Sequence, residues 1–462
     1  MSVPIASERV LPTLNADGTR RRIRPKLYAG PRLTGRRRVA WLLMVLFAAI
    51  PWLEWNKKPL VLLDLPRREF TLFGTTFLPT DGVLLMLLLL AIFIAIIATT
   101  AVVGRAWCGW ACPQTVYMEF LFRPIERLFE GRPEDQRKLD RSGPSLRRVA
   151  KNGVFLIVSF VLANVFLSYF VGLRTLLAWT RLSPFEHWEP FLVVAVTTGL
   201  VFFDFAFFRE QMCTVACPYA RLQSVLLDPR SLIVGYDKTR GEPRGKGKIQ
   251  PGRGDCIDCN ACVAACPTGI DIRDGLQLEC IACAQCVDAC DGIMQKIKRP
   301  LGLIRYGSQV ELEARPRAST PARIFRPRVV VYGVLLAGLL VTLGTLAGTR
   351  QPAEVTVLRG LGAPFTVEQG RVTGALRVKV QNRGAEGRRY RLEILASPPV
   401  TLIAPENPLD VAGGAHRTTA LFVVAPTNSF HAGRREIVVR VADDHGFTAD
   451  TPYRLVGPEE VP

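Results

Sequence analysis

Histidine is scarce in this sequence of 462 residues, which contains only four of them. A haem b that is bound between transmembrane helices needs histidine ligands on those helices. His187 falls in the loop segment SPFEHWEP, and the other three histidines lie beyond residue 410. The sequence also has no CxxCH motif for covalent haem, and no glycine-rich dinucleotide fingerprint follows a predicted strand. Haem and nucleotide chemistry are therefore not expected.

Cysteine is confined to the middle of the chain, and a cleavable leader is not expected. All twelve cysteines lie between Cys108 and Cys290. About forty polar and basic residues precede the first apolar run, and no small-residue cleavage site follows it closely, so this run is expected to remain as a membrane anchor. The formal charge of +19 does not indicate nucleic-acid binding, because no basic patch is interleaved with aromatic residues.

Long apolar runs are abundant. Hydrophobic residues make up 49% of the chain, and five runs approach the roughly 20 residues that are needed to cross a bilayer. The fourth run contains Asp204, an acid that could be buried or functional but is more often interfacial near a helix end. The predicted fold class is an α-helical membrane protein with about five transmembrane helices. The runs cover residues 39–55, 82–103, 153–173, 190–208 and 328–347.

Lysine and arginine beside these runs predict their orientation, since such residues are enriched in cytoplasmic loops. Basic residues are dense between Arg20 and Arg38 and between Arg123 and Lys151, so both segments are expected in the cytoplasm. With five spans, the C-terminus lies across the membrane from the N-terminus. The predicted domains are a basic cytoplasmic segment (1–38), a four-helix membrane region (39–208), a cytoplasmic segment (209–327), a fifth transmembrane helix (328–347) and a C-terminal domain (350–462).

Residues 350–462 alternate apolar and polar residues in short runs such as LRVKVQ and EIVVRVA, separated by turn signals such as NRG and AGG. This pattern predicts a C-terminal all-β, immunoglobulin-like sandwich. The segment holds no cysteine and nothing that suggests catalysis, so a structural or docking role is expected. Its histidines, His416, His431 and His445, lack the tight spacing of metal ligands and are expected at the surface.

Two cysteine runs of the form CxxCxxCxxxC follow each other with thirteen residues between them. In bacterial two-cluster ferredoxins, three cysteines of one run and the last cysteine of the other hold each cubane. The runs therefore predict two 4Fe-4S clusters in an inserted ferredoxin domain at about 250–300, which would receive electrons from a partner protein or from quinol. The predicted ligands are Cys256, Cys259, Cys262 and Cys290 for one cluster and Cys280, Cys283, Cys286 and Cys266 for the other.

A pair of zinc sites is the alternative interpretation, but two consecutive four-cysteine runs suit cubanes better than tetrahedral zinc. The second run departs from the first in one respect, because Asp291 follows Cys290 whereas Pro267 follows Cys266. Proline removes an N–H group that could approach a cluster sulfur. We expect the change to tune a reduction potential more than to abolish cluster binding.

Two CxxxCP motifs lie after the second and fourth apolar runs. Pro113 and Pro218 are each expected to begin a helix, because proline favours the first helical position. Cys112 and Cys217 would then lie at helix N-termini, where the helix dipole lowers the pKa of a thiol. The four cysteines of these motifs are candidates for a copper or redox site: Cys108, Cys112, Cys213 and Cys217.

The sequence leaves the chemistry of these four cysteines open. They could converge on Cu(I) or another metal, hold a further cluster, or form redox-active disulfides. The bland alternative is four small, buried, apolar residues. Met118 and Met212 lie close by and could add thioether ligands, although packing in a core is the commoner role of methionine.

Several longer motifs accompany the cysteines. YDKTRGEPRGK precedes the two runs and KRPLGLIRY follows them, and the CxxxCP motifs lie within CGWACPQTVYMEFLFRPIE and EQMCTVACPYARLQSVL. Together with RLSPFEHWEP and the membrane layout, they resemble the cytochrome c oxidase accessory proteins CcoG, also called FixG or RdxA, over nearly the whole chain. The motifs also look like those of membrane ferredoxins of periplasmic nitrate and nitrous oxide reduction systems.

The resemblance to CcoG implies a polyferredoxin-like protein of the bacterial inner membrane, with its ferredoxin domain in the cytoplasm and its C-terminal domain in the periplasm. It implies a cupric reductase that supplies Cu(I) to the cbb3-type cytochrome c oxidase. The partners implied are membrane lipid, oxidase assembly factors or copper chaperones, and an unidentified electron donor, and a homodimer is left open. The alternatives are an electron conduit from quinol to a periplasmic reductase or flavin partner, and a non-catalytic assembly scaffold.

Overall fold

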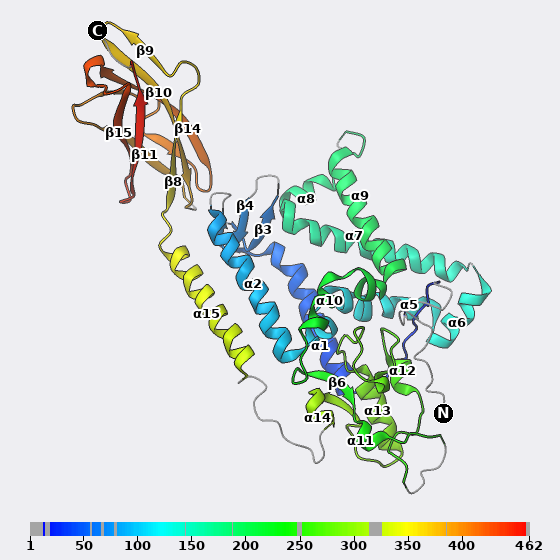
Figure 1. The fold of residues 1–462 in the computed structure, drawn as a ribbon. Coiled ribbons are helices and arrows are strands. Elements are labelled where there is room, and N and C mark those ends of the chain that lie inside the picture. Colours follow the sequence, from blue (N-terminus) through cyan, green and yellow to red (C-terminus); the bar gives the residue numbers. More distant parts are fainter. Residues whose placement is uncertain are drawn as a thin grey trace. The chain divides into compact units, whose positions relative to one another are not determined.

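The computed structural model describes residue 13 and residues 19–55, 58–65, 69–77, 81–143, 145–186, 188–246, 252–313, 326–384 and 386–458. His187 lies outside these described residues. The chain forms two compact units. The first holds the long helices and the cysteine-rich segment, and the second consists of residues 54–60, 69–79 and 344–462 (Figure 1).

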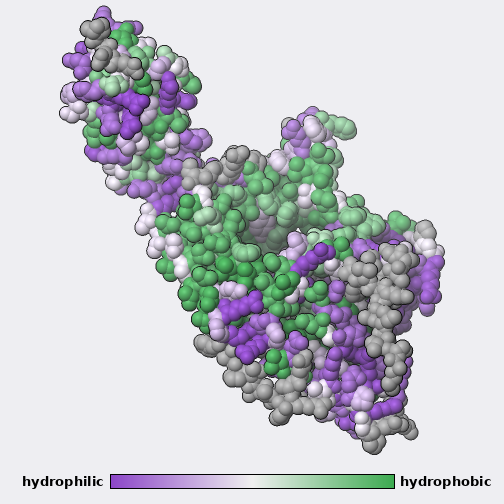
Figure 2. Space-filling view, in the orientation of Figure 1, coloured by the Kyte–Doolittle hydropathy of each residue, from purple (hydrophilic) through white to green (hydrophobic). Residues whose placement is uncertain are grey.

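Among the described residues, four helices are long and apolar enough to cross a membrane. They are α2 (Gly82–Val103), α7 (Leu146–Val171), α9 (Trp188–Phe203) with its π-helical continuation Asp204–Phe208, and α15 (Pro327–Gly348). Figure 2 shows hydrophobic side chains over the surface around α2 and hydrophilic side chains around α11 (Lys238–Gly241) and α13 (Gln285–Lys296). The chain is therefore a membrane protein with a polar, cysteine-rich segment attached to its apolar helices.

The first predicted span differs from the helix that forms there. Helix α1 runs from Pro31 to Ala49, so that its first turns carry arginines, and a 3-10 turn at Ile50–Trp52 and the short strand β1 (Glu54–Trp55) follow it. Its apolar part, residues 39–49, is only about 16 Å long at 1.5 Å per residue, against about 30 Å of hydrocarbon. Among the described residues, four helices thus have the length and composition of a membrane span, where the sequence predicts about five. The placement of the two chain ends on opposite sides of the membrane, which five spans predict, requires α1 to cross as well, and this orientation stays a prediction.

The N-terminus of α1 rests on the cysteine-rich segment. The Asp288 carboxylate of α13 accepts hydrogen bonds from the backbone N–H groups of Arg32 (3.2 Å) and Leu33 (2.7 Å). Gly30 makes this approach possible, because a Cβ there would clash with the Asp288 side chain. Free N–H groups at a helix start attract a carboxylate, so this buried acid fixes α1 against α13.

Short elements connect the long ones within the first unit. Strands β6 (Ile233–Tyr236) and β7 (Ile304–Gly307) pair antiparallel and flank the two cysteine runs. The remaining helices are α3 (Ala106–Trp110), α4 (Pro113–Tyr117), α5 (Arg123–Glu130), α6 (Pro133–Ser142), α8 (Leu173–Trp179), α10 (Pro218–Leu226), α12 (Ala261–Ala265) and α14 (Gln309–Glu313). Strand β3 (Val61–Asp64) also belongs to the first unit, whereas β2 (Lys58–Pro59), β4 (Glu69–Leu72) and β5 (Thr75–Phe77) belong to the second.

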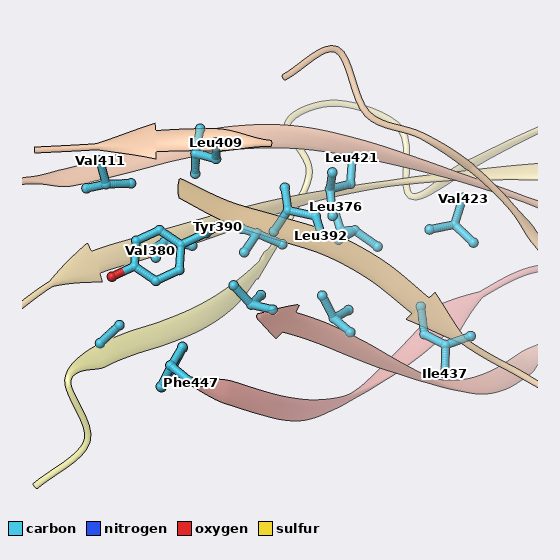
Figure 3. Packing of buried hydrophobic residues seen from close by; sticks show 14 of the residues in the cluster. Leu376, Val380, Tyr390, Leu392, Leu409, Val411, Leu421, Val423, Ile437 and Phe447 are labelled. Atoms are coloured by element: carbon cyan, nitrogen blue, oxygen red, sulfur yellow. The ribbon is translucent and has the colours of Figure 1, made fainter. Parts of the chain in front are cut away.

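The C-terminal segment is an all-β sandwich of immunoglobulin-like form, as predicted. One sheet has the order β12-β14-β10-β8 with β9 beside β10, and the other has the order β13-β11-β15-β16. Alternate residues face the core between the sheets, where Leu376, Tyr390 and Val439 are fully buried (Figure 3). The strands are β8 (Ala353–Arg359), β9 (Phe365–Glu368), β10 (Arg371–Asn382), β11 (Arg388–Leu395), β12 (Thr401–Ile403), β13 (Leu409–Val411), β14 (His416–Pro426), β15 (Arg434–Asp443) and β16 (Thr448–Val456).

A buried network of charges joins the polar ends of the long helices. The Glu126 carboxylate accepts hydrogen bonds from Arg209 through both oxygens (2.9 and 2.6 Å) and from Arg24 through one (2.5 Å). Burial alone would raise the pKa of Glu126, but Arg209, Arg24 and Lys151 outweigh burial and lower the pKa. Glu126 is therefore an ionised acid inside the protein, held by three cations.

Removing Glu126 should destabilise the first unit strongly. Glu126→Ala leaves Arg209 and Arg24 buried without their shared partner, and breaking a buried ion pair in this way costs about 3–5 kcal/mol. We expect the apparent unfolding temperature of the protein in detergent to fall by several degrees. The matched control is Glu134→Ala, which removes the exposed partner of Lys26 and should leave the unfolding temperature unchanged. Equal effects of the two changes would contradict this assignment.

Candidate metal centre

The two cysteine runs enclose two adjacent cavities. The first cavity is lined by Cys256, Cys259, Cys262 and Cys290, together with apolar residues of α13 and β7. The second is lined by Cys266, Cys280, Cys283 and Cys286, and Cys262 borders it as well. The structure thus brings together the same two groups of four that the spacing predicts. The assignment of each sulfur to a particular cluster remains a prediction.

The backbone of the two runs has the same unusual conformation at equivalent positions. Asp258 and Ala282, each just before the second cysteine of its run, have φ values of 53°. Asn260 and Ala284, each just after it, have φ values of 56° and 58°. A positive φ is costly for residues other than glycine and is found where a functional geometry requires it. The two loops therefore wind in the same way around their cavities.

The difference at Asp291 has a structural effect. Helix α12 ends at Ala265, just before Cys266 and Pro267, whereas α13 continues through Cys290 to Lys296. Proline after the last cysteine stops the first helix, since it disfavours a helical conformation in the residue before it. Asp291 permits six further residues of helix, and its carboxylate accepts a hydrogen bond from the Gly302 N–H at 2.8 Å.

The cavity cysteines are poor thiolates without a metal. Burial raises the pKa of Cys280 and Cys290 to about 12 and that of Cys262 and Cys283 to about 11. Bound iron would offset this burial, because a coordinated thiol loses its proton. In the part of the chain that the structure describes, no three ligating side chains are placed to hold a single ion. Cysteines spread around a cavity fit a cubane, whose four irons are held by separate sulfurs, better than one zinc ion.

Both CxxxCP motifs begin helices as predicted. Cys112 precedes Pro113 at the start of α4, and Cys217 precedes Pro218 at the start of α10. Cys213 lies in a π-helical turn, Met212–Ala216. Burial raises the pKa of Cys213 to about 12, and Cys112, Cys108 and Cys217 lie close enough to raise it further by charge repulsion. The structure therefore gathers all four cysteines into one region.

Cys108 occupies the most enclosed position of the four. Its thiol donates a hydrogen bond to Gln223 Oε1 (3.0 Å), and Gln223 Nε2 donates in turn to the Tyr219 hydroxyl (2.8 Å) and to Thr100 Oγ1 (3.1 Å). Burial raises the pKa of Cys108 to about 11. The sequence did not predict the contacts of Gln223 and Tyr219 with this thiol and with each other, although both residues lie one helical turn apart within the motif CPYARLQSVL.

The first CxxxCP motif packs directly against the second cavity. Cys108, Ile281 and Cys283 form one buried group. At Gly109 a Cβ would lie 2.5 Å from the Ile281 carbonyl oxygen and 2.8 Å from the Cys283 backbone. Arg36 of α1, which is almost fully buried, donates from Nε to the Gly109 carbonyl (2.8 Å) and holds the motif in place. The sequence predicted Arg36 only as one of the basic residues that indicate membrane orientation.

The two methionines have different surroundings. Met118 packs with Phe122, Phe155 and Phe205 in a buried apolar cluster, so it has the core role that is common for methionine. Met212 is partly exposed beside a large cavity next to Cys213.

This fold and this centre define a membrane-bound iron-sulfur protein of the dicluster ferredoxin type. Comparison with protein-family models agrees. Residues 208–309 match a 4Fe-4S dicluster domain, and residues 343–458 match the IG-like fold at the C-terminus of FixG. Residues 85–132, which include Cys108 and Cys112, match a 4Fe-4S binding domain.

Three curated relatives match most of the chain. Protein RdxA of Cereibacter sphaeroides is 36% identical, with 90% of this chain and 92% of RdxA covered. The nitrogen fixation protein FixG of Rhizobium meliloti is 35% identical over 83% of this chain and 81% of its own. Protein RdxB of Cereibacter sphaeroides is 33% identical over 89% and 92%. The chain belongs to the FixG/RdxA family, and it is an iron-sulfur electron-transfer protein.

The close approach at Gly109 gives a direct test of this packing. Gly109→Ala places a methyl group against backbone atoms that cannot turn away, which we expect to cost about 1–3 kcal/mol and to lower the iron content of the purified protein. Gly292→Ala is the matched control, because nothing lies within 4 Å of a Cβ there and alanine favours the helix. Equal iron content and unfolding temperature in the two variants would show that the motif does not press on the cavity loop.

Proposed function

We propose that this protein is a cupric reductase that converts Cu(II) to Cu(I) for the assembly of a cbb3-type cytochrome c oxidase. Copper is the substrate, and Cys108, Cys112, Cys213 and Cys217 are the residues that hold it. The observation that carries the proposal is the shared buried group of Cys108, Ile281 and Cys283. Because Cys108 is in contact with a loop of the cluster cavity, an electron from a bound cluster would have a short route to copper held by this thiol.

The cavity linings support the predicted cluster ligands. Cys256, Cys259, Cys262 and Cys290 would hold one cluster, and Cys266, Cys280, Cys283 and Cys286 would hold the other. Each bound 4Fe-4S cluster supplies one-electron redox chemistry at a potential set by its surroundings. The chain supplies those surroundings: apolar walls, backbone loops wound around each cavity, and Arg273 beside the first cavity, where it pairs with Asp258 and Asp271.

The thiols of the CxxxCP motifs suit copper chemically. Soft thiolates favour Cu(I) over Cu(II), so they raise the potential of the bound ion and make its one-electron reduction easier. The raised pKa values of Cys108 and Cys213 mean that a metal must displace protons from these thiols on binding. Because Cys108 is tied to Gln223, its thiol has to leave this hydrogen bond to reach copper.

A specific observation favours a second candidate function. The segment that matches a 4Fe-4S binding domain, residues 85–132, contains Cys108 and Cys112 but none of the eight cavity cysteines. In this candidate function the four CxxxCP cysteines hold a further cluster, and the protein is an electron conduit from quinol to a periplasmic reductase or flavin partner, without copper chemistry.

The setting that we propose follows the family and the flanking charges. The protein lies in the bacterial inner membrane, with the N-terminal and ferredoxin segments in the cytoplasm and the sandwich in the periplasm, where it docks oxidase assembly factors or copper chaperones. A non-catalytic scaffold with structural clusters is the remaining alternative. It predicts that Cys259→Ser leaves oxidase maturation intact.

Metal counting separates these functions. Anaerobically purified protein should contain about eight iron atoms and about eight sulfides per chain if two 4Fe-4S clusters are present, and about twelve of each if the CxxxCP cysteines hold a third. EPR of the reduced protein should show interacting clusters in either case. About eight iron atoms together with copper bound on titration supports the reductase, whereas about twelve contradicts it.

The copper site itself is tested by cysteine variants. The protein is first reduced with dithionite and freed of excess dithionite, and Cu(II) is then added with a Cu(I)-specific chelator. We expect Cys108→Ser and Cys217→Ser to lower the rate of Cu(I) formation by at least about tenfold, because thiolate is the preferred Cu(I) ligand. Their iron content should stay at the wild-type value. Cys286→Ser is the contrasting variant, since it should lose iron. If both CxxxCP variants keep the wild-type rate, these cysteines are not the copper site.

A further inference from the structure

A large cavity lies among the apolar helices, separate from the two cysteine cavities. Its volume is about 510 Å³, which lies within the range of small-molecule sites. Phe47 of α1, Tyr117 of α4, Phe166 of α7 and Val201 of α9 contribute to its wall, so four elements of the first unit enclose it.

The cavity opens between two of the helices that can cross a membrane. Phe166, Leu200 and Phe203 line it, and each is about half exposed on α7 or α9. In a bilayer such side chains face lipid, so the opening is reached from the hydrocarbon rather than from water. A ligand of this cavity is therefore a lipid-soluble molecule.

Three polar residues, Gln114, Tyr117 and Asp204, line this otherwise apolar cavity. Gln114 Nε2 donates to Asp204 Oδ1 (3.0 Å) and to the Arg209 carbonyl oxygen (3.1 Å), so that it orients the carboxylate. Among the residues that the structure describes, Asp204 Oδ2 and the Tyr117 hydroxyl have no hydrogen-bond partner, and no cation pairs with Asp204. An acid without a counter-ion is costly inside an apolar region and marks a functional site.

Three π-helical segments border the same place. Asp204–Phe208 begins at the acid, Met118–Phe122 directly follows Tyr117, and Met212–Ala216 begins at Met212, which also lines the cavity. π-Helical turns are rare and are enriched at functional sites, because the extra residue re-aims side chains. Two of these segments contribute residues to the cavity wall themselves.

We propose that this cavity binds the head group of a membrane quinone, with Asp204 and Tyr117 as its hydrogen-bonding partners and Gln114 as a positioning residue. A quinone ring fits between aromatic side chains such as Phe47 and Phe205, and its isoprenoid tail leaves between α7 and α9. An acyl chain would fill the same apolar space, but it would leave both polar groups without a partner. The polar residues therefore favour the quinone.

The chemistry at this site is quinol oxidation. Two O–H bonds of the quinol break and two C=O bonds form, with release of two protons and two electrons. The Asp204 carboxylate accepts the proton of the nearer hydroxyl, and water accepts the other. The electrons leave to one-electron acceptors of the iron-sulfur class, one electron to each. Pro113 and Met212 in the cavity wall directly adjoin Cys112 and Cys213, which places the donor beside the cysteine-rich region.

Binding is measured on the full-length protein in nanodiscs of phosphatidylethanolamine and phosphatidylglycerol. An azido-substituted short-chain ubiquinone is photolysed, and the labelled peptides are identified by mass spectrometry. We expect labels within residues 113–122 and 198–212 and their suppression by decylubiquinone. A naphthoquinone competitor, menadione, shows which quinone class binds better. Labels spread over lipid-facing residues and unaffected by either competitor would mean that the cavity holds only lipid.

Variants connect the label to the proposed residues. Asp204→Asn should weaken competition by decylubiquinone about tenfold, because a charge-assisted hydrogen bond is lost, and Val201→Trp should abolish labelling by filling the cavity. Glu189→Gln, an exposed acid at the other end of α9, is the control and should bind as the wild type does. Tyr117→Phe gives a second test if Asp204→Asn fails to fold, as judged by gel filtration and iron content.

Reduction is followed separately by EPR. Anaerobic decylubiquinol should produce the signal of reduced clusters in the wild type, at a rate at least about tenfold lower in Asp204→Asn. Unchanged competition and unchanged reduction in Asp204→Asn and Tyr117→Phe would overturn the proposal. Copper enters neither measurement, so failure of the quinone site leaves the dithionite-driven copper assay intact, and failure of the copper proposal leaves this one intact.

Discussion

The bidentate contact between Glu126 and Arg209 connects the two halves of the cysteine region. Glu126 lies on the helical stretch that begins at Pro113, immediately after the first CxxxCP motif, and Arg209 lies in the turn just before the second motif. The contact thus sets the distance between motifs that are about a hundred residues apart in the chain. Arg24 adds the N-terminal segment to the same carboxylate. Because all three side chains are buried, none can leave without exposing the charge of another.

The same contact is linked by hydrogen bonds to the wall of the large apolar cavity. The Arg209 guanidinium pairs with Glu126, and the Arg209 carbonyl accepts a hydrogen bond from Gln114. Gln114 donates a second hydrogen bond to Asp204. The acid in the cavity is therefore tied, through Gln114, to the network that aligns the cysteine motifs.

Local patterns in the sequence predicted those parts of the fold that local physics decides. The uniformly apolar run over 82–103 forms one helix, the alternation after residue 350 forms a sandwich, and Pro113 and Pro218 begin helices where proline is favoured. Helix α1 (Pro31–Ala49) does not coincide with the predicted span 39–55, because a helix can extend beyond the end of an apolar run. Arg36 to Arg38 are good helix formers, so the helix starts among the charges, and Arg36 is buried by its contact with Gly109 rather than exposed as a topology signal.

The sequence predicted the cysteines that line the two cavities, but it did not predict the residues that pack against them. Each cavity is lined by three closely spaced cysteines of one run and the last cysteine of the other, so the two groups of four could be predicted from the spacing in the sequence. The contact of Cys108 with Ile281 and Cys283 joins segments about 170 residues apart, and no local pattern encodes such a contact. The roles of Gln223 and Asp204 could not be predicted for the same reason, because their partners Cys108 and Gln114 are distant in the sequence and meet them only in the folded chain.

The carboxylate of Asp288 has a consequence for the order of biosynthesis. It caps the start of α1 from 255 residues further along the chain, so this cap is not available to α1 until α13 has been made. The final packing of α1 therefore depends on the correct folding of the cysteine-rich segment.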